Sequence, residues 1–429
     1  MNELFLHYVW QYQYFDKTDL RTTSGETIRI FSAGSRNPDA GPDFLQARLK
    51  IGDIQWVGSV EIHIDSAGWH QHSHQHDPAY DNVILHVVWM DTMPVVRNDG
   101  NLLPTLELHQ RVDDNLLEQY KNLMGSISII PCSPMLDRVR PIVILNTLDK
   151  MLITRLESRA DGILKMLDRN RGDWQETAYQ LLARNYGFKI NADPFLQLAQ
   201  ALPLKVLRKH SDKLLQLEAL LFGVAGFLDE DRIDSYYLLL KREYLLLRQK
   251  FSLDQKSMRA MQWKFLRLRP ANFPTLRLAQ LAALLAFEQN IFASFLDGDV
   301  RSLTGLFQQP PSEYWQHHYN FKSYTARKDA VIGTDAVNNL LINTVAPLLA
   351  AYAIFTDSQQ HMEKAIRILQ QLPAESNKII SKWNAVSLKC KNAFDSQALI
   401  EMYSNLCSRH RCLDCNIGAS LVKPGRNPC

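Results

Sequence analysis

Six of the 13 histidines in the chain lie in one short stretch, between His63 and His86. Acidic residues are interleaved with them, namely Glu61, Asp65 and Asp77. Imidazole nitrogens and carboxylate oxygens bind divalent metals, and the same groups act as general acids and bases in catalysis. The density of such groups favours a metal or catalytic site over an ordinary polar surface.

The first acid and the first histidine of this stretch belong to one predicted strand. Residues 54–64, IQWVGSVEIHI, have the composition of a β-strand, and alternate side chains of a strand point to opposite faces. Glu61 and His63 therefore share one face. Val60 and Ile62 lie on the other face, which we expect to meet the core.

Four more histidines alternate in the run WHQHSHQHD, residues 69–77. On a strand their side chains would line one face, and on a loop they could converge on one point. We take His72 and His74 as the preferred metal ligands, and a solvent-exposed polar loop is the alternative. His86 lies inside the apolar run VILHVVW, where we expect it to satisfy a buried partner.

An acid from the preceding strand can complete the site only if the strand register allows it. Asp43 directly precedes the predicted strand 44–51, and residues 52–53, Gly-Asp, form a good hairpin turn. In a regular hairpin Asp43 would face Ile62 and lie on the wrong side of the sheet. A bulge or an odd-length loop is needed to bring Asp43 beside Glu61.

This arrangement resembles the core of the PD-(D/E)xK nucleases, in which an acid at one strand, a hairpin and Glu-x-Lys on the next strand form the site. Here GPDF and VEIH stand in those places, with His63 where the nucleases carry lysine. The resemblance implies a restriction-endonuclease-like open α/β sheet and Mg²⁺ or Mn²⁺ bound by Asp43 and Glu61. It also implies that His63 assists the water or the metal, that Glu3 of the leading helix is a further acid, and that the substrate is DNA or RNA.

The chain as a whole resembles a bacterial family of unknown function over nearly all its length. The motifs that carry this resemblance are GPDF, VEIH, a Trp-x-x-His-x-His block, LHVVW and a terminal cysteine cluster. The family implies no activity, so the functional hypotheses rest on the residues themselves.

Two other interpretations of the same residues stay open. One is a nucleic-acid- or protein-binding module that keeps the fold without the chemistry. The other is a cupin-like metal enzyme that uses His70, His72 and His74. The cupin-like interpretation requires a closed β-barrel, and a helix-flanked open sheet would exclude it.

A second candidate metal site lies near the end of the chain, where CSRHRCLDC spaces three cysteines as C-x4-C-x2-C. Thiolates at this spacing, Cys407, Cys412 and Cys415, can bind zinc or an iron–sulfur cluster. Cys132 is the preferred fourth ligand, because it directly follows the first domain and could clamp the two ends of the chain. The alternatives are buried free thiols, or a fourth ligand drawn from Cys390, Cys429 and His410.

Charge and composition divide the chain into an acidic front and a basic back. Residues 1–130 read as mixed α/β and carry a net charge of −8, whereas residues 131–429 read as mostly helical and carry +11. A basic region suits a polyanion. Arg267, Arg269 and Arg277 are the candidate phosphate contacts, with Trp263 and nearby phenylalanines either stacking on bases or filling the core.

The remaining bulk features predict a cytoplasmic protein without a membrane span. Six cysteines in 429 residues do not make a disulfide scaffold, and the start MNELFLHYVW has no basic targeting region. The longest apolar run, TVAPLLAAYAIF, is shorter than the roughly 20 residues that a membrane helix needs.

Overall fold

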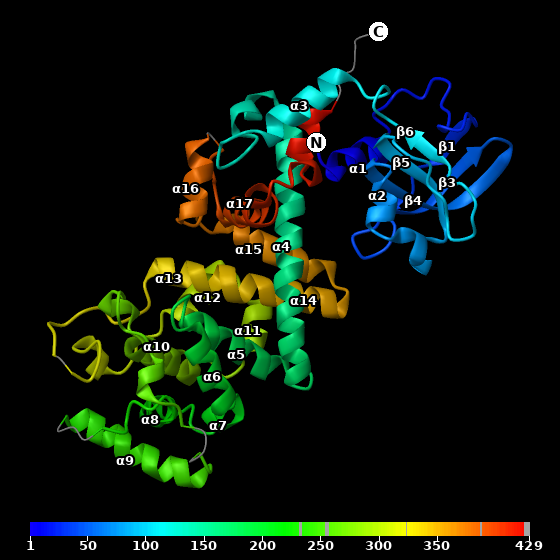
Figure 1. Cartoon of the computed structure of the whole chain (residues 1–429). Helices are drawn as coiled ribbons and strands as arrows, with labels where there is room; N and C mark the ends of the chain where they lie inside the picture. The colour runs from blue at the N-terminus through cyan, green and yellow to red at the C-terminus, as the bar shows by residue number, and fades with distance from the viewer. Residues whose placement is uncertain (231–233, 254–256, 323, 387, 424–429) are drawn as a thin grey trace. The chain divides into compact units, whose positions relative to one another are not determined.

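The computed structural model describes residues 1–230, 234–253, 257–322, 324–386 and 388–423 (Figure 1). The chain divides into two compact units, one of Met1–Leu148 with Met402–Cys429 and one of Asp149–Glu401. The boundary expected at residue 130 lies inside the first unit. The C-terminal segment also belongs to this unit, so the two ends of the chain share one fold.

A mixed six-stranded sheet forms the centre of the first unit. Its order is β1 (Ile28–Ser32), β3 (Phe44–Ile51), β4 (Ile54–Asp65), β5 (Val83–Met90) and β6 (Thr105–Glu107), with β2 (Ser35–Arg36) paired to β3. Strand β3 pairs antiparallel with β1, β2 and β4, whereas β5 is parallel to β4 and β6 is parallel to β5. Within the described residues β1 and β6 do not pair, so the sheet stays open. The predicted α/β front domain is confirmed, and the closed barrel of the cupin-like interpretation is not formed.

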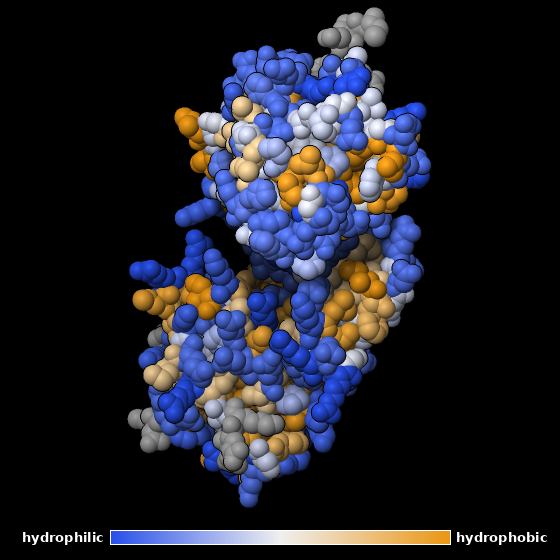
Figure 2. All heavy atoms as spheres, turned by 45° about the vertical axis from the view of Figure 1, so that its right-hand side comes forward, coloured by the Kyte–Doolittle hydropathy of each residue, from blue (hydrophilic) through white to orange (hydrophobic). Residues whose placement is uncertain are grey.

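The long strand β4 changes character along its length. Its first four residues are exposed or half-buried, with Val57 66% exposed, whereas every residue from Gly58 to His63 is buried. The face that carries Glu61 and His63 is therefore covered, although we expected that polar face to point away from the core. On the face drawn in Figure 2, hydrophilic side chains cover most of the first unit and apolar ones form separate patches.

Helix α1 (Glu3–Tyr12) covers part of the sheet and packs against β4. The Asn2 side chain caps its first turn by accepting from Phe5 N, as is usual for an asparagine at this position. One face of α1 is apolar and buried, and the Trp10 indole donates to Ala33 O at 3.1 Å. This packing fixes which residues α1 turns toward the end of β4.

Short helical turns connect β4 to the parallel strand β5. They are α2 (Gly68–Gln71), η1 (His74–His76) and η2 (Pro78–Tyr80). The histidine run is therefore neither a strand nor an irregular loop. Trp69 anchors it in a small apolar cluster with Val83, Val95 and Leu103. Because Trp69 anchors the connection and α2 packs against β4, its histidines stay close to β4.

The rest of the first unit comes from both ends of the helical region. After the sheet come α3 (Asp114–Met124) and η3 (Ser133–Arg138), and the chain ends in η8 (Cys407–Arg409), η9 (Cys412–Asp414) and α18 (Asn416–Val422). Figure 1 shows this last segment beside α1 and α3. Tyr8 OH donates to Ala419 O at 2.9 Å, and Arg36 pairs with Asp414 at 2.6 Å.

The second unit is helical, as predicted for the back of the chain. Helix α4 (Pro141–Arg169) leads into it from the first unit. The other helices are α5 (Trp174–Tyr186), α6 (Ala192–Ala201), α7 (Leu204–Arg208), α8 (Leu214–Val224), α9 (Ser235–Lys250), η4 (Ala260–Gln262), η5 (Pro270–Asn272), α10 (Pro274–Phe287), α11 (Ile291–Asp297), α12 (Val300–Phe307), η6 (Glu313–Gln316), α13 (Thr334–Leu340), η7 (Leu341–Val345), α14 (Ala346–Thr356), α15 (Gln359–Gln371), α16 (Lys378–Ala385) and α17 (Ala393–Asn405).

One helical stretch of the second unit is long and apolar enough to cross a membrane. Elements α13, η7 and α14 form a continuous helix over Thr334–Thr356, 23 residues, which is longer than the apolar run TVAPLLAAYAIF alone. Of its most apolar window, 67% is buried inside the protein, as in the core helix of a globular unit. Helices α10 and α11 pass the same test only as a pair, which bends by 80°.

Candidate metal centre

A β-bulge in β3 shifts its pairing with β4 by one residue. The pairing is regular from the hairpin turn as far as Ala47 with Gly58, whereas Phe44 pairs with Val60. Inside the bulge, Gln46 adopts the left-handed conformation with φ of 57°. The bulge that the site hypothesis required is therefore confirmed.

The bulge places the two predicted acids side by side. Asp43 N donates to Glu61 Oε2 at 3.1 Å, and Ile62 N donates to Asp43 Oδ2 at 3.0 Å. Gly34, between β1 and β2, lies against this irregular stretch of β3 and leaves room for its backbone. A Cβ at Gly34, where φ is +86°, would lie 2.6 Å from Leu45 O, so only glycine fits there without a shift.

Helix α1 directs two residues toward the same acids. His7 Nε2 lies 3.2 Å from Asp43 Oδ2. Glu3 is one helical turn earlier on the same face and is near enough for its charge to raise the pKa of Glu61. We predicted Glu3 but missed His7. Its i,i+4 spacing from Glu3 in an amphipathic helix is the signal that could have identified it.

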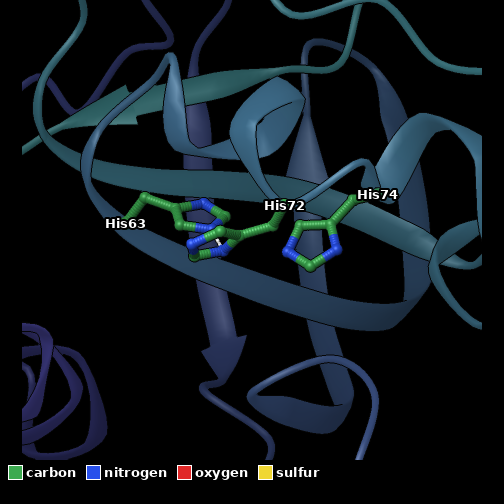
Figure 3. A group of neighbouring side chains, drawn as sticks. All are labelled: His63, His72 and His74. Carbon is green, nitrogen blue, oxygen red and sulfur yellow. Dashed lines mark hydrogen bonds between the residues drawn. The ribbon is translucent and has the colours of Figure 1, made fainter.

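Three histidines from β4 and the following turns converge beside Glu61. One ring nitrogen from each of His63, His72 and His74 lies within 4.8 Å of the other two. Figure 3 shows these rings gathered over β4, with a hydrogen bond of 3.2 Å between His63 Nε2 and His72 Nδ1. His74 Nε2 lies 3.3 Å from Glu61 Oε1. His63 is buried and His74 nearly so, while His72 faces the solvent.

Neighbouring groups hold the His63 ring in place. Its Nδ1 lies 2.8 Å from Nε2 of His86 on β5, so the buried partner of His86 is another imidazole. Gly68 at the start of α2 packs against the ring, and a Cβ there would lie 2.7 Å from His63 Cδ2. The glycine therefore allows the chain to turn directly over the imidazole. His70 and His76 lie outside the group of three.

Burial and like charges shift the pKa values of this site so that each group favours its neutral form. Burial, and then the charge of Asp43, raise the pKa of Glu61 to about 9. Burial, followed by the neighbouring imidazoles His86, His74 and His72, lowers the pKa of His63 to about 3. Burial likewise lowers the pKa of His74. His63 and His74 are therefore neutral near pH 7 and keep the lone pairs that a metal ligand needs.

Several ligand atoms of the site lack hydrogen bonds of their own. His74 Nε2 and both ring nitrogens of His7 are buried without a hydrogen-bond partner among the described residues. Two of these nitrogens nevertheless lie 3.2 and 3.3 Å from carboxylate oxygens. Imidazole nitrogens that lie beside carboxylate oxygens without a hydrogen bond of their own are arranged as metal ligands are, so the residues present fit a divalent ion.

The structure also brings four cysteines together in the first unit. Cys407, Cys412 and Cys415 lie in or beside the terminal turns, Cys132 caps η3, and all four are 7% exposed. Burial, then the charges of Cys415 and Cys412, raise the pKa of Cys132 to about 12. Burial and then Cys132 raise the pKa of Cys407. This buried group of thiols can hold a metal once the thiols are deprotonated.

The other candidates for a fourth ligand at the cysteines are placed differently. Cys390 belongs to the second unit and is half-buried. His410 is exposed in a left-handed turn between η8 and η9. Cys429 lies outside the described residues. Cys132 is therefore the candidate whose position matches the role we predicted for it.

The predicted phosphate contacts of the second unit differ in exposure. Arg267 and Arg269 are exposed in the segment between η4 and α10. Arg277 is 4% exposed, donates to Gln280 and Asn272 at 2.8 and 2.6 Å, and lies over the ring of Phe188. This burial argues against Arg277 as a phosphate contact, because its guanidinium serves the protein core.

The aromatic residue singled out beside those arginines lies in the core. Trp263 is 4% exposed, and its indole donates to Ala225 O at 2.9 Å. Phe195 packs against it edge-on with ring centroids 5.0 Å apart. Trp263 therefore fills the core, as in the second of the two interpretations, and is not available to stack on a base.

Comparison with known proteins adds a family but no activity. No curated protein and no solved structure matches the chain. Nothing in these comparisons links it to the PD-(D/E)xK nucleases. A model of one family, described as a protein of unknown function (DUF2851), matches residues 3–378, which include the sheet, the histidines and most of the helical unit. The chain therefore belongs to the DUF2851 family.

Proposed function

We propose that the first unit is a metal-dependent hydrolase of phosphodiester bonds in nucleic acid. The observation that carries this proposal is the pairing of Asp43 with Glu61 through a bulge, beside the convergent nitrogens of His63, His72 and His74. Side chains from separate segments of the chain meet there. The raised pKa of Glu61 shows that burial beside Asp43 destabilises its ionised form. A buried acid kept beside a second acid indicates a site selected for ligand binding rather than for stability.

The proposed ligands are His63, His72, His74 and Glu61, with Asp43 adjoining them. Three imidazoles and a carboxylate suit Mn²⁺ or Zn²⁺ better than Mg²⁺, which prefers oxygen ligands. A divalent ion at this place supplies the polarisation of a phosphoryl oxygen and lowers the pKa of a bound water molecule.

The protein's own residues prepare this chemistry. In the tautomer in which His63 Nδ1 donates to His86 Nε2, 2.8 Å away, His63 Nε2 keeps its lone pair for the ligand position beside His72 Nδ1. Ile62 N holds the Asp43 carboxylate by a hydrogen bond. His7, which lies 3.2 Å from that carboxylate, is placed to accept or deliver a proton at its Nε2 atom.

Nucleic acid as the substrate is supported by three features of the chain. The motifs GPDF and VEIH resemble the core of the PD-(D/E)xK nucleases, and the second part of the chain carries a net charge of +11. Arg267 and Arg269 are exposed and available to phosphates.

A second candidate function is a binding module without turnover. It is favoured by His63, because the nucleases carry a lysine at this position and the neutral imidazole brings no positive charge near pH 7. Metal-independent, salt-sensitive binding to DNA or RNA without cleavage would support this alternative.

The test combines metal analysis with cleavage of labelled single- and double-stranded DNA and RNA in Mn²⁺, Zn²⁺ or Mg²⁺. We expect Glu61→Gln and His72→Asn to abolish cleavage and to weaken metal binding by at least about tenfold, because each removes a ligand atom. His76→Asn is the matched control, since His76 is an exposed histidine of the same turns outside the group of three. Equal activity in His72→Asn and His76→Asn would refute the site.

We also propose that Cys132, Cys407, Cys412 and Cys415 bind a structural metal centre, either zinc or an iron–sulfur cluster. Their shared burial and the mutual effect on their pKa values support this proposal. The site sits away from solvent in the segment that ends the chain, which suits a stabilising role. Metal analysis separates the two options by zinc content on one side and iron, sulfide and visible absorbance on the other.

A further inference from the structure

A pocket of about 290 Å³ lies beside the histidine cluster and shares His74 with it. Besides His74, the residues that matter for its chemistry are Gln75, Tyr80, Asp81, Arg97 and Asn98. They come from the turns after β4 and from the loop after β5. A substrate held at the histidines would therefore extend directly into this pocket.

The pocket is lined by polar atoms that the protein leaves without partners. Gln75 Oε1, Arg97 Nε and Trp69 Nε1 are buried and make no hydrogen bond among the described residues. Buried polar atoms are normally satisfied, because each unpaired one destabilises the fold. Three such atoms on residues that line one pocket indicate a place built to form hydrogen bonds with a group from outside the chain.

Arg97 has the chemistry of an anion-binding residue. Within the described part of the chain no carboxylate pairs with its guanidinium, and burial lowers the pKa of Arg97. Asp99 is close, but its carboxylate accepts from Asn101 N and Asn101 Nδ2 at 3.0 and 2.9 Å. The same turn holds the Arg97 backbone, whose N donates to Asn101 O at 2.9 Å. A guanidinium with no ion pair among the described residues can bind a phosphate through its planar fork of donors.

The other walls of the pocket suit the rest of a nucleotide. The Tyr80 ring is stacked on His74 with centroids 3.8 Å apart, and Trp69 meets it edge-on at 6.0 Å, so the aromatic wall is rigid. Asp81 and Asn98 provide oxygen acceptors for hydroxyl or amino groups. An anion alone would gain nothing from Asp81, whereas a phosphate carried on a sugar would use both kinds of group.

We propose that this pocket binds one nucleotide of the substrate, with its phosphate on Arg97 and its sugar or base donors on Asp81 and Asn98. The inference rests on the proposed function for its biological setting, because the pocket adjoins the histidines. Its binding chemistry stands on the pocket alone and can be measured without any cleavage.

The experiment is calorimetric titration of the whole protein with 5′-AMP and with adenosine, in the presence of a chelator. We expect wild-type protein to bind 5′-AMP about tenfold or more tightly than adenosine, because only 5′-AMP offers a charged partner to Arg97. Arg97→Gln should weaken 5′-AMP binding by about 10- to 100-fold and remove the preference. Arg97→Lys should fall between, since lysine keeps the charge without the planar fork.

Arg48→Gln is the matched control, because Arg48 is an exposed arginine of β3 that does not line the pocket. Binding of 5′-AMP that depends on Arg97 but not on Arg48 supports the pocket, even if no nucleic acid is cleaved. Failure of the wild type to prefer 5′-AMP overturns the inference. An Arg97→Gln variant that binds 5′-AMP with wild-type affinity and cleaves nucleic acid with wild-type KM also overturns it. In that case, cleavage that depends on Glu61 would leave the proposed function standing.

Discussion

Glu61 is a carboxyl that is 5% exposed and lies against the backbone and the carboxyl of Asp43. Burial and the neighbouring charge raise its pKa to about 9, so in the metal-free protein it holds a proton near pH 7. A divalent ion would reverse this preference by stabilising the carboxylate. Metal binding at this residue should therefore release a proton, as is usual for sites whose ligands must ionise.

The raised pKa of Glu61 predicts a stability that falls with rising pH in the metal-free protein. In the unfolded chain a glutamate is ionised above about pH 4.3, whereas folded Glu61 keeps its proton up to about pH 9. Since the unfolded state binds fewer protons in between, each pH unit costs up to about 1.4 kcal/mol. His63 acts in the opposite direction only below about pH 6.5, because its pKa is lowered.

Calorimetry with chelator at about pH 7 and about pH 8 checks this prediction. We expect the Tm of the first unit to fall by about 3–5 °C over that step in the wild type. Glu61→Gln should remove this part of the fall, because glutamine does not titrate. Equal slopes in wild type and variant would show that Glu61 is already ionised in the metal-free fold.

At the level of elements, the bulge of β3 decides whether the site exists. A regular hairpin would place Phe44 opposite Glu61 and turn Asp43 to the other face of the sheet. The cost of the bulge is concentrated at Gln46, which adopts φ of 57°. A left-handed conformation in a residue other than glycine costs about 1–3 kcal/mol, and such strain is often found at functional sites.

Substitutions at Gln46 should separate register from chemistry, because this side chain is exposed and contributes no ligand. Gln46→Gly should stabilise the protein by about 1 kcal/mol and keep metal affinity, since glycine accepts this backbone without strain. Gln46→Val should destabilise it by about 1–2 kcal/mol and weaken metal binding, because a β-branched residue disfavours the bulge. Thermal unfolding and metal titration measure both effects. A valine variant that matches the glycine variant in both would contradict the role of the bulge.

At the scale of the whole molecule, the two ends of the chain belong to one unit. Cys132 follows the sheet, and Cys407, Cys412 and Cys415 lie more than 270 residues later. Tyr8 with Ala419, and Arg36 with Asp414, add contacts between the same ends. A metal held by the four cysteines would close a very long loop, and cross-links over long loops remove much conformational freedom from the unfolded chain.

Loss of the cysteine centre should therefore destabilise the first unit. We expect Cys412→Ser to remove the bound metal and to cost about 2 kcal/mol or more, which lowers the Tm of that unit by about 4–8 °C. Cys390→Ser is the control, because Cys390 is a half-buried cysteine of the second unit. Calorimetry with elemental analysis checks both variants. Wild-type metal content and Tm in Cys412→Ser would rule out the centre.

Much of the secondary structure of this protein follows from the local pattern of apolar and polar residues. Alternation along residues 54–64 placed Glu61 and His63 on one face, and the change from β-branched runs to leucine-rich helical pattern separated the sheet from the helical region. These features depend on neighbours within a few residues, which is why the sequence alone determines them. The spacing of the last three cysteines is local in the same sense.

Other features were decided only by tertiary structure. The site of the bulge, the folding of the histidine run into helical turns around Trp69 and the approach of His7 to Asp43 depend on contacts between separate elements. The sequence predicts Arg277 as a surface cation, yet it is buried, and its guanidinium donates to the side-chain amides of Gln280 and Asn272. Local propensity carries no information on such long-range packing. The sequence by itself therefore determined which groups can do chemistry, and the tertiary structure decided which of them meet.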